Sequence, residues 1–197
     1  MPIKTNRTSV KGSAESLVER VRNWVDKRVN AGGEPDCVRM LEEQHMLVRK
    51  LFGQIESAKG VRERRALFDE LLTSLAIHTE MEEKVFYPAM KRESTGSILL
   101  ESMEEHLAVK RLLADLIEMH PADDRWMAKI AVLRESVEHH AREEERILLP
   151  RALAIFDAET RMALTQEMVG AAVALIEGED EDVRTSILAH TGEAAPI

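Results

Sequence analysis

The sequence predicts an all-α protein: an up-down-up-down four-helix bundle with additional N-terminal and C-terminal helices. Composition is the first sign. Hydrophobic residues make up 44% of the chain and are mostly Leu, Ala, Val and Met, and only 4% of residues are aromatic. Leu, Ala and Met favour helices over sheets. Periodicity is the second, since apolar residues recur three and four positions apart. The third is the position of helix-breaking residues, because short segments containing Gly, Pro, Ser or Asn separate the long periodic segments.

These breaks divide the chain into four parts. Residues 1–12 are polar and predict a disordered lead-in, and residues 13–34 predict an N-terminal helix and linker. Residues 35–152 predict the bundle, and residues 153–197 predict a C-terminal helix with a polar tail.

Helix start and stop signals locate the elements more finely. Pro35 and Asp36 open the first bundle helix, Pro121 separates the third from the fourth, and Pro150 is expected to bend or end the fourth. The expected helices cover about residues 36–57, 61–90, 97–120 and 122–149 in the bundle and 158–177 after it.

Charge and cysteine content narrow the function classes. The net charge is −9, from 27 basic and 36 acidic residues, and an acidic chain repels phosphate backbones, so no nucleic-acid partner is expected. The single cysteine, Cys37, excludes an intramolecular disulfide and a multi-cysteine metal site. With no signal core and no membrane-spanning apolar run, we expect a cytoplasmic protein without a membrane partner.

The buried stripe of each bundle helix contains one histidine, and two of the stripes add a glutamate one turn later on the same face. A carboxylate buried among aliphatic side chains is costly unless it is paired or coordinates a metal. Neutral imidazole and carboxylate groups both suit iron. The pattern therefore predicts a pair of divalent metal ions, held by six candidate ligands: His45, His78, Glu82, His106, His140 and Glu144.

An internal repeat strengthens this prediction. Each His-x-x-x-Glu pair is followed by a second glutamate, Glu83 or Glu145, and then, at the same distance, by a proline. The same helical periodicity extends the buried stripes to Val85 and Ile147. One such pair is a weak signal, whereas two copies in register, each with a histidine on the preceding helix, are a strong one.

Each histidine also has a simpler interpretation, because a lone buried histidine is more often a hydrogen-bonded core residue than a ligand. The joint pattern outweighs that interpretation for the four on the stripes. His139 lies off the stripe and is expected to be exposed or beside a ligand, His120 belongs to a helix end, and His190 to the tail. Cys37 is expected to be a small buried residue.

These residues resemble the hemerythrin-like (HHE) family over about residues 36–152, and Tyr87-Pro88 belongs to the matching motif. The resemblance implies that Glu82 and Glu144 bridge two iron ions (Fe2+/Fe3+), with the four histidines as terminal ligands. Oxygen-carrying hemerythrins place a further histidine one turn after the third-helix histidine. Here that position is Lys110, which we expect to extend to solvent, with a hydrogen bond to a bound oxygen species as the alternative.

Ligand counting indicates the function. With an oxo or hydroxo bridge, the six residues leave about two coordination positions open, which suits O2, peroxide or nitric oxide. Three classes stay open: a metal, O2 or NO sensor or iron-handling protein without turnover, an enzyme, and a helical scaffold with a vestigial metal site. The apolar faces of the two end helices either pack back onto the bundle, which we favour, or form a homodimer.

Overall fold

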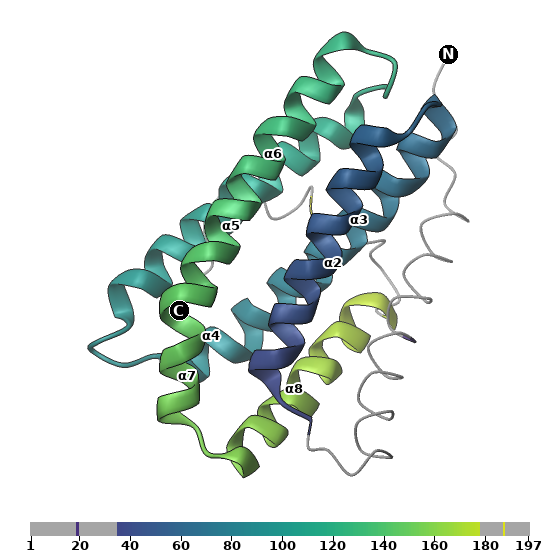
Figure 1. Cartoon of the computed structure of the whole chain (residues 1–197). Coiled ribbons are helices and arrows are strands. Elements are labelled where there is room, and N and C mark those ends of the chain that lie inside the picture. The colour runs from purple at the N-terminus through teal and green to yellow at the C-terminus, as the bar shows by residue number, and fades with distance from the viewer. Residues whose placement is uncertain (1–18, 20–34, 178–186, 188–197) are drawn as a thin grey trace.

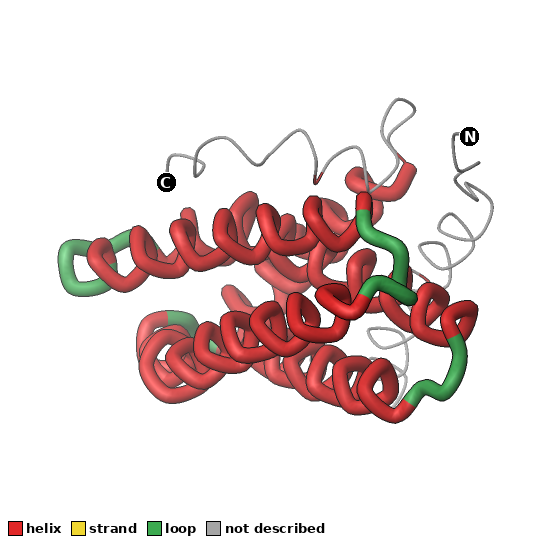
Figure 2. The backbone as a smooth tube through the Cα atoms, turned by 90° about the horizontal axis from the view of Figure 1, so that it is seen from above, coloured by secondary structure: helices red, strands yellow, loops and turns green. Residues whose placement is uncertain are grey.

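A computed structural model of the chain describes residue 19, residues 35–177 and residue 187. Every element within this described part is helical, which confirms the predicted fold class (Figures 1 and 2). The predicted lead-in and N-terminal helix lie outside the described residues, except for Glu19, which is helical.

Four long helices form the bundle: α2 (Cys37–Ser57), α3 (Val61–Met81), α5 (Gly96–Glu118) and α6 (Asp124–Glu143). Helices α2 and α3 form one hairpin, α5 and α6 form the other, and α2 also packs against α6. Short loops join the helices at the ends of the bundle (Figure 2). None of the described helices has the combination of length and apolar character that a membrane crossing requires.

Side-chain caps place two of the helix starts. The carboxylate of Asp36 accepts hydrogen bonds from the backbone N–H groups of Val38 and Arg39 at 3.0 and 3.4 Å. Asp123 accepts in the same way from the N–H of Arg125 at 2.9 Å. These bonds satisfy backbone donors that the first helical turn leaves unpaired, so the helices begin close to the positions expected from the sequence.

Both histidine–glutamate helices change into one turn of π-helix at the glutamate. These turns are η1 (Glu82–Phe86), followed by α4 (Tyr87–Met90), and η2 (Glu144–Leu148), followed by α7 (Leu149–Ile155). A proline at the second position of α4 and of α7 has no N–H to donate to the preceding turn, and a wider turn accommodates this loss. Instead of ending the helix, Pro150 is followed by helix as far as Ile155.

The π-turns change which side chains face the core. The expected stripe positions Val85 and Ile147 are only partly buried, whereas their neighbours Phe86 and Leu148 have no exposed surface. A π-turn contains an additional residue, so the helical face advances by about one position. The prediction of Val85 and Ile147 as core residues is therefore corrected to Phe86 and Leu148.

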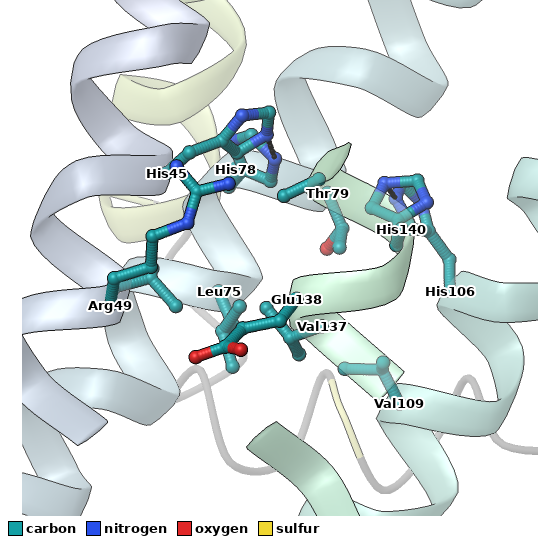
Figure 3. A pocket seen from close by; sticks show the side chains of 12 residues that line it. His45, Arg49, Leu75, His78, Thr79, His106, Val109, Val137, Glu138 and His140 are labelled. Atoms are coloured by element: carbon teal, nitrogen blue, oxygen red, sulfur yellow. Dashed lines mark hydrogen bonds between the residues drawn. The ribbon is translucent and has the colours of Figure 1, made fainter. Parts of the chain in front are cut away.

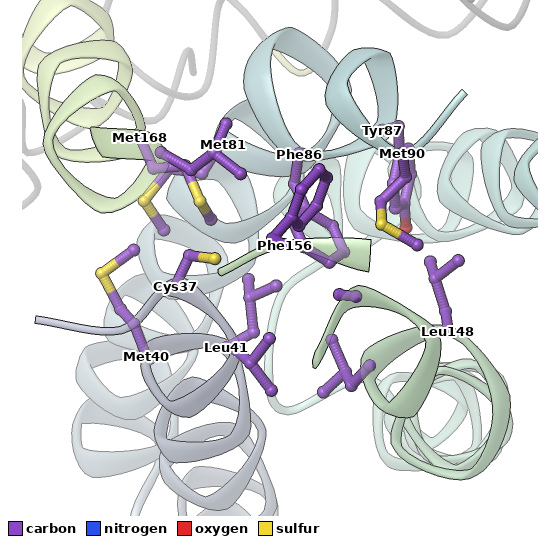
Figure 4. Packing of buried hydrophobic residues seen from close by; sticks show 14 of the residues in the cluster. Cys37, Met40, Leu41, Met81, Phe86, Tyr87, Met90, Leu148, Phe156 and Met168 are labelled. Atoms are coloured by element: carbon purple, nitrogen blue, oxygen red, sulfur yellow. The ribbon is translucent and has the colours of Figure 1, made fainter. Parts of the chain in front are cut away.

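The C-terminal helix packs back onto the bundle. Helix α8 (Ala158–Glu177) has the predicted bounds and lies against α2, α3 and η1. Its Met168 belongs to the same buried cluster as Met40 and Met81 (Figure 4). A second hydrophobic cluster of the bundle contains Phe68 and Trp126. Ile187, within the segment predicted as a polar tail, is buried in this second cluster.

Candidate metal centre

The structure brings together all six side chains that the sequence indicates as metal ligands. The four histidines come one from each bundle helix, and the two glutamates are the first residues of η1 and η2. All are at most 5% exposed, between the two hydrophobic clusters of the core: His45, His78, Glu82, His106, His140 and Glu144.

The histidines form two close pairs. The Nε2 atoms of His45 and His78 are 3.2 Å apart, and those of His106 and His140 are 3.0 Å apart. Each pair comes from one helical hairpin, and both pairs face the same interior space (Figure 3).

Each glutamate lies between the two pairs. Oε2 of Glu82 is 3.2 Å from Nε2 of His78 and 3.3 Å from Nε2 of His106. Oε2 of Glu144 is 3.4 Å from Nε2 of His45 and 3.6 Å from Nε2 of His140. Every carboxylate therefore reaches one histidine of each hairpin, which is the arrangement that a bridging ligand needs.

The Nδ1 atoms of the histidines point away from the centre, and two of them donate hydrogen bonds to side chains of their own hairpin. Nδ1–H of His78 donates to Oε1 of Gln44 at 2.7 Å, and Nδ1–H of His140 donates to Oε2 of Glu105 at 2.8 Å. Gln44 and Glu105 each directly precede the stripe histidine of the neighbouring helix. In each hairpin, the residue before the histidine of the first helix therefore orients the histidine of the second helix.

The other two histidines bind across the hairpins. Nδ1–H of His45 donates to Oε1 of Glu145, and Nδ1–H of His106 donates to Oε1 of Glu83, both at 3.0 Å. Because an ionised carboxylate can only accept, the proton of each neutral ring is on Nδ1, and the Nε2 lone pair points inward. Such outer hydrogen bonds orient metal-ligating histidines.

The inner atoms of this cluster lack donors. Both carboxylate oxygens of Glu82 and Oε2 of Glu144 are buried without a hydrogen-bond partner among the described residues. A buried acceptor left unsatisfied costs about 1–3 kcal/mol, and paired Nε2 lone pairs at 3.0–3.2 Å repel each other. Cations between these atoms would satisfy all of them, so the donor set fits bound metal.

The pKa values of the inner groups are strongly displaced. Burial and then the repulsion of Glu144 raise the pKa of Glu82 well above its ordinary value. Although burial opposes it, the neighbouring carboxylates of Glu144 and Glu145 raise the pKa of His45. Burial likewise opposes ionisation of Glu144, but neighbouring His140 and His45 hold the pKa of that carboxyl well below its ordinary value.

The comparison with known families decides what this site is. The Hemerythrin HHE cation binding domain model matches residues 36–152, the segment that contains all six residues. The chain belongs to the hemerythrin HHE cation-binding family. The resemblance predicted from the sequence is confirmed over the same residues.

Relatives of this HHE protein lie in several bacteria. It is 26% identical over 140 residues to the uncharacterized protein Rv2633c of Mycobacterium tuberculosis, covering 71% of this chain and 86% of that protein. It is 27% identical to an HHE cation binding domain-containing protein of known crystal structure, the Rv2633c homolog from Mycobacterium kansasii, with a TM-score of 0.62 over 77% of this chain and 98% of that chain. A 113-residue stretch is 26% identical to a DNA nickase of Nostoc sp., covering 57% of this chain and 31% of the nickase.

Two basic side chains form ion pairs at the edge of the HHE centre. The sequence placed Lys110 in solvent and did not identify Arg49. Nζ of Lys110 is 2.7 Å from both oxygens of Glu83, so Lys110 forms an ion pair instead of extending to solvent as the sequence predicted. Nη1 and Nη2 of Arg49 contact Glu145 at 2.8 and 3.0 Å. The shared signal is spacing, because Arg49 and Lys110 each follow a stripe histidine by one turn.

A tyrosine also reaches the HHE centre. The hydroxyl of Tyr87 donates to Oε1 of Glu144 at 2.8 Å and lies 3.3 Å from Nε2 of His106. Tyr87 follows the π-turn η1, which brings it to the fully buried side. The equivalent position after η2 is Leu149, so the two halves of the centre differ here.

The remaining histidines and the cysteine are not part of the set of six candidate ligands. His139 has 59% of its side chain exposed, as its position off the stripe predicted. His120 is exposed at the end of α5, and His190 lies outside the described residues. Cys37 is buried, and burial, followed by the charge of Asp36, raises its pKa to about 12, which makes it a poor nucleophile.

A pocket opens onto the edges of the four histidines of the HHE centre (Figure 3). Arg49 and Glu138 also contribute to its lining. Much of the remaining wall is aliphatic, which favours a small, weakly polar ligand over a charged substrate: Val48, Leu75, Val109 and Val137.

Metal binding is expected to release protons. Because the raised pKa values of Glu82 and His45 favour their protonated forms in the metal-free HHE centre, a metal must displace those protons. Affinity for Fe2+ should therefore increase as the pH rises from about 5 to about 8. Anaerobic calorimetry in buffers of different ionisation enthalpy would measure this release, and a binding enthalpy that is the same in every buffer would contradict it.

Proposed function

We propose that the protein binds two iron ions in this centre and reacts there with a small ligand, namely O2, peroxide or nitric oxide. The supporting observation is the position of Glu82 and Glu144, each of which reaches a histidine of both hairpins with oxygens that otherwise have no partner. One metal between each histidine pair and a carboxylate bridge on either side would use the whole donor set.

When bound, the irons would supply the redox chemistry, with about two coordination positions open to a small ligand. The pocket that the four histidines line also has an aliphatic wall. A small apolar molecule can enter such a space without losing hydrogen bonds to water. This supports a diatomic ligand such as O2 or NO in preference to a bulky substrate.

Tyr87 is the residue of this chain best placed to hold a proton beside the reacting ligand. Burial, and then the charge of Glu144, raise its pKa well above the ordinary value. The phenol therefore stays protonated and donates its hydrogen bond to Oε1 of Glu144. By this bond Tyr87 orients one carboxylate, and its hydroxyl oxygen lies 3.3 Å from Nε2 of His106.

Replacing Tyr87 with phenylalanine is expected to leave the iron content unchanged and to slow peroxide consumption by at least about tenfold. The ring still fills its fully buried position, but the hydroxyl proton is lost. The matched control is Leu149→Met, at the equivalent position of the other hairpin, which should alter neither quantity. Equal peroxide rates in Tyr87→Phe and the unaltered protein would contradict this role.

The proposed function is tested with anaerobically iron-loaded protein. We expect about two irons per chain, oxidation to a stable ferric form in air and measurable consumption of hydrogen peroxide. An adduct that releases O2 under vacuum would indicate a carrier, and iron binding without any response to O2, peroxide or NO would indicate an iron-handling protein or a scaffold. One zinc per chain, or no metal, would overturn the proposal.

The proposed partners follow from charge and composition. The net charge of −9 supports a small-molecule ligand in place of nucleic acid. With one cysteine in the chain, we also propose a reducing, cytoplasmic location without a membrane partner.

A further inference from the structure

The outer faces of the two hairpins differ at three positions of the repeat. In the first hairpin, Gln44 lies beside Met81, and Ile77 and Met81 are buried in the cluster that α8 covers. The equivalent residues of the second hairpin are Glu105, His139 and Glu143. Where the first hairpin has one amide and two apolar core residues, the second therefore has three potential metal ligands at its surface.

These three side chains converge. Nε2 of His139 is 3.5 Å from Oε1 of Glu105 and 4.0 Å from Oε2 of Glu143, and one ligand atom from each lies within 4.8 Å of the others. The two distances are long for hydrogen bonds. They are close to the separation of about 3–4 Å between ligand atoms that each lie about 2.0–2.2 Å from one metal ion.

The helical spacing explains why the three groups meet. His139 and Glu143 are one turn apart on α6 and thus share a face. Glu105 reaches that face from α5, which packs against α6 within the same hairpin. One imidazole and two carboxylates, with water completing the shell, are a donor set that first-row divalent ions accept.

Glu105 also contacts the buried centre. While its Oε1 faces His139, its Oε2 accepts the Nδ1–H of His140 at 2.8 Å. One carboxylate therefore links the surface cluster to a histidine of the buried cluster. A cation outside would withdraw negative charge from the hydrogen bond that orients His140.

We propose that Glu105, His139 and Glu143 form a second, surface site for a divalent first-row transition metal ion, coupled to the buried centre through Glu105. The site is distinct from the six buried residues, and its occupancy does not depend on which small ligand reacts at the centre. A metal ion bound outside is sensed inside by the change in the Glu105–His140 hydrogen bond.

The test uses the full-length, iron-loaded protein without a polyhistidine tag, titrated with Zn2+ by calorimetry. We expect one additional zinc ion per chain, bound at least about tenfold more weakly by His139→Ala and by Glu143→Gln. Both side chains are partly or largely exposed, so these variants should fold. The control is His120→Ala, an exposed histidine at the end of α5, which should bind zinc like the unaltered protein.

The coupling has its own readout, because zinc should shift the visible absorption of the iron centre in the unaltered protein and leave it unchanged in His139→Ala. Equal zinc affinity in His139→Ala and the unaltered protein, or no additional zinc at all, would overturn the site. Zinc binding at His139 without any spectral shift would overturn the link through Glu105. The spectral readout rests on the proposed iron centre, whereas zinc binding reads the surface site directly, so failure of the proposed function and failure of the surface site give different results.

Discussion

Replacing Glu144 with alanine is expected to reduce the iron content from about two per chain to almost none. Its Oε2 lies between His45 of one pair and His140 of the other, so one substitution removes a ligand from both proposed metal positions. The measurement is iron per chain by elemental analysis after anaerobic reconstitution, with far-UV circular dichroism to establish that the helices are retained. An iron content near that of the unaltered protein would contradict the bridging role.

Two adjacent histidines supply the matched control for this result. His140 is 5% exposed and faces the centre, whereas His139 has 59% of its side chain exposed. We expect His140→Ala to lose iron and His139→Ala to retain it when no excess metal is present. Equal losses would show that the ligand face of α6 has been assigned incorrectly.

Removal of the metal by a chelator is expected to lower the melting temperature by about 5–10 °C. A ligand at a hundred times its dissociation constant stabilises the folded state by about 2.7 kcal/mol, and each kcal/mol shifts the melting temperature of a chain of this size by about 2–4 °C. The physical cause is the buried set of lone pairs and carboxylate oxygens, in which both oxygens of Glu82 and Oε2 of Glu144 have no hydrogen-bond partner among the described residues. Thermal denaturation with and without chelator measures the difference, and unchanged melting would contradict it.

Glu82→Leu separates this effect from general damage to the core. The raised pKa of Glu82 means that its contribution to the stability of the metal-free protein is fully present below the ordinary carboxyl pKa of 4.5 and is lost as the pH rises through the raised value. Metal-free Glu82→Leu should therefore be at least as stable as the metal-free unaltered protein, increasingly so as the pH rises above 4.5. Its melting should not respond to iron. A less stable metal-free variant would contradict the account.

The helices themselves were predictable because their determinants are local. Asp36 caps α2, the prolines and glycines lie in or near the breaks, and the bounds of α8 follow from apolar periodicity. The six ligand candidates could be chosen for the same reason. Residues one turn apart share a face, and a repeated histidine–glutamate pair in an apolar stripe has few explanations other than metal.

Helical periodicity failed where the helix itself changed. The expected core positions Val85 and Ile147 assume a constant α-helical turn, but the π-turns η1 and η2 transfer burial to Phe86 and Leu148. The same turns place Tyr87 beside Glu144. Packing around the candidate ligands decides where the helix accommodates the hydrogen bond that a proline cannot make. No local sequence pattern contains that information.

By itself, the sequence determined the all-α class, the family and the face of each helix that carries the ligand candidates, because these depend on residue type and on a period of 3.6 residues per turn. Only the tertiary structure decided which outer group orients each histidine. Glu83 binds His106 and Lys110, and Glu145 binds His45 and Arg49, from one hairpin to the other and over 23 to 100 residues of the chain. Such contacts depend on how the two hairpins are placed against each other, and the spacing along one helix does not specify that placement.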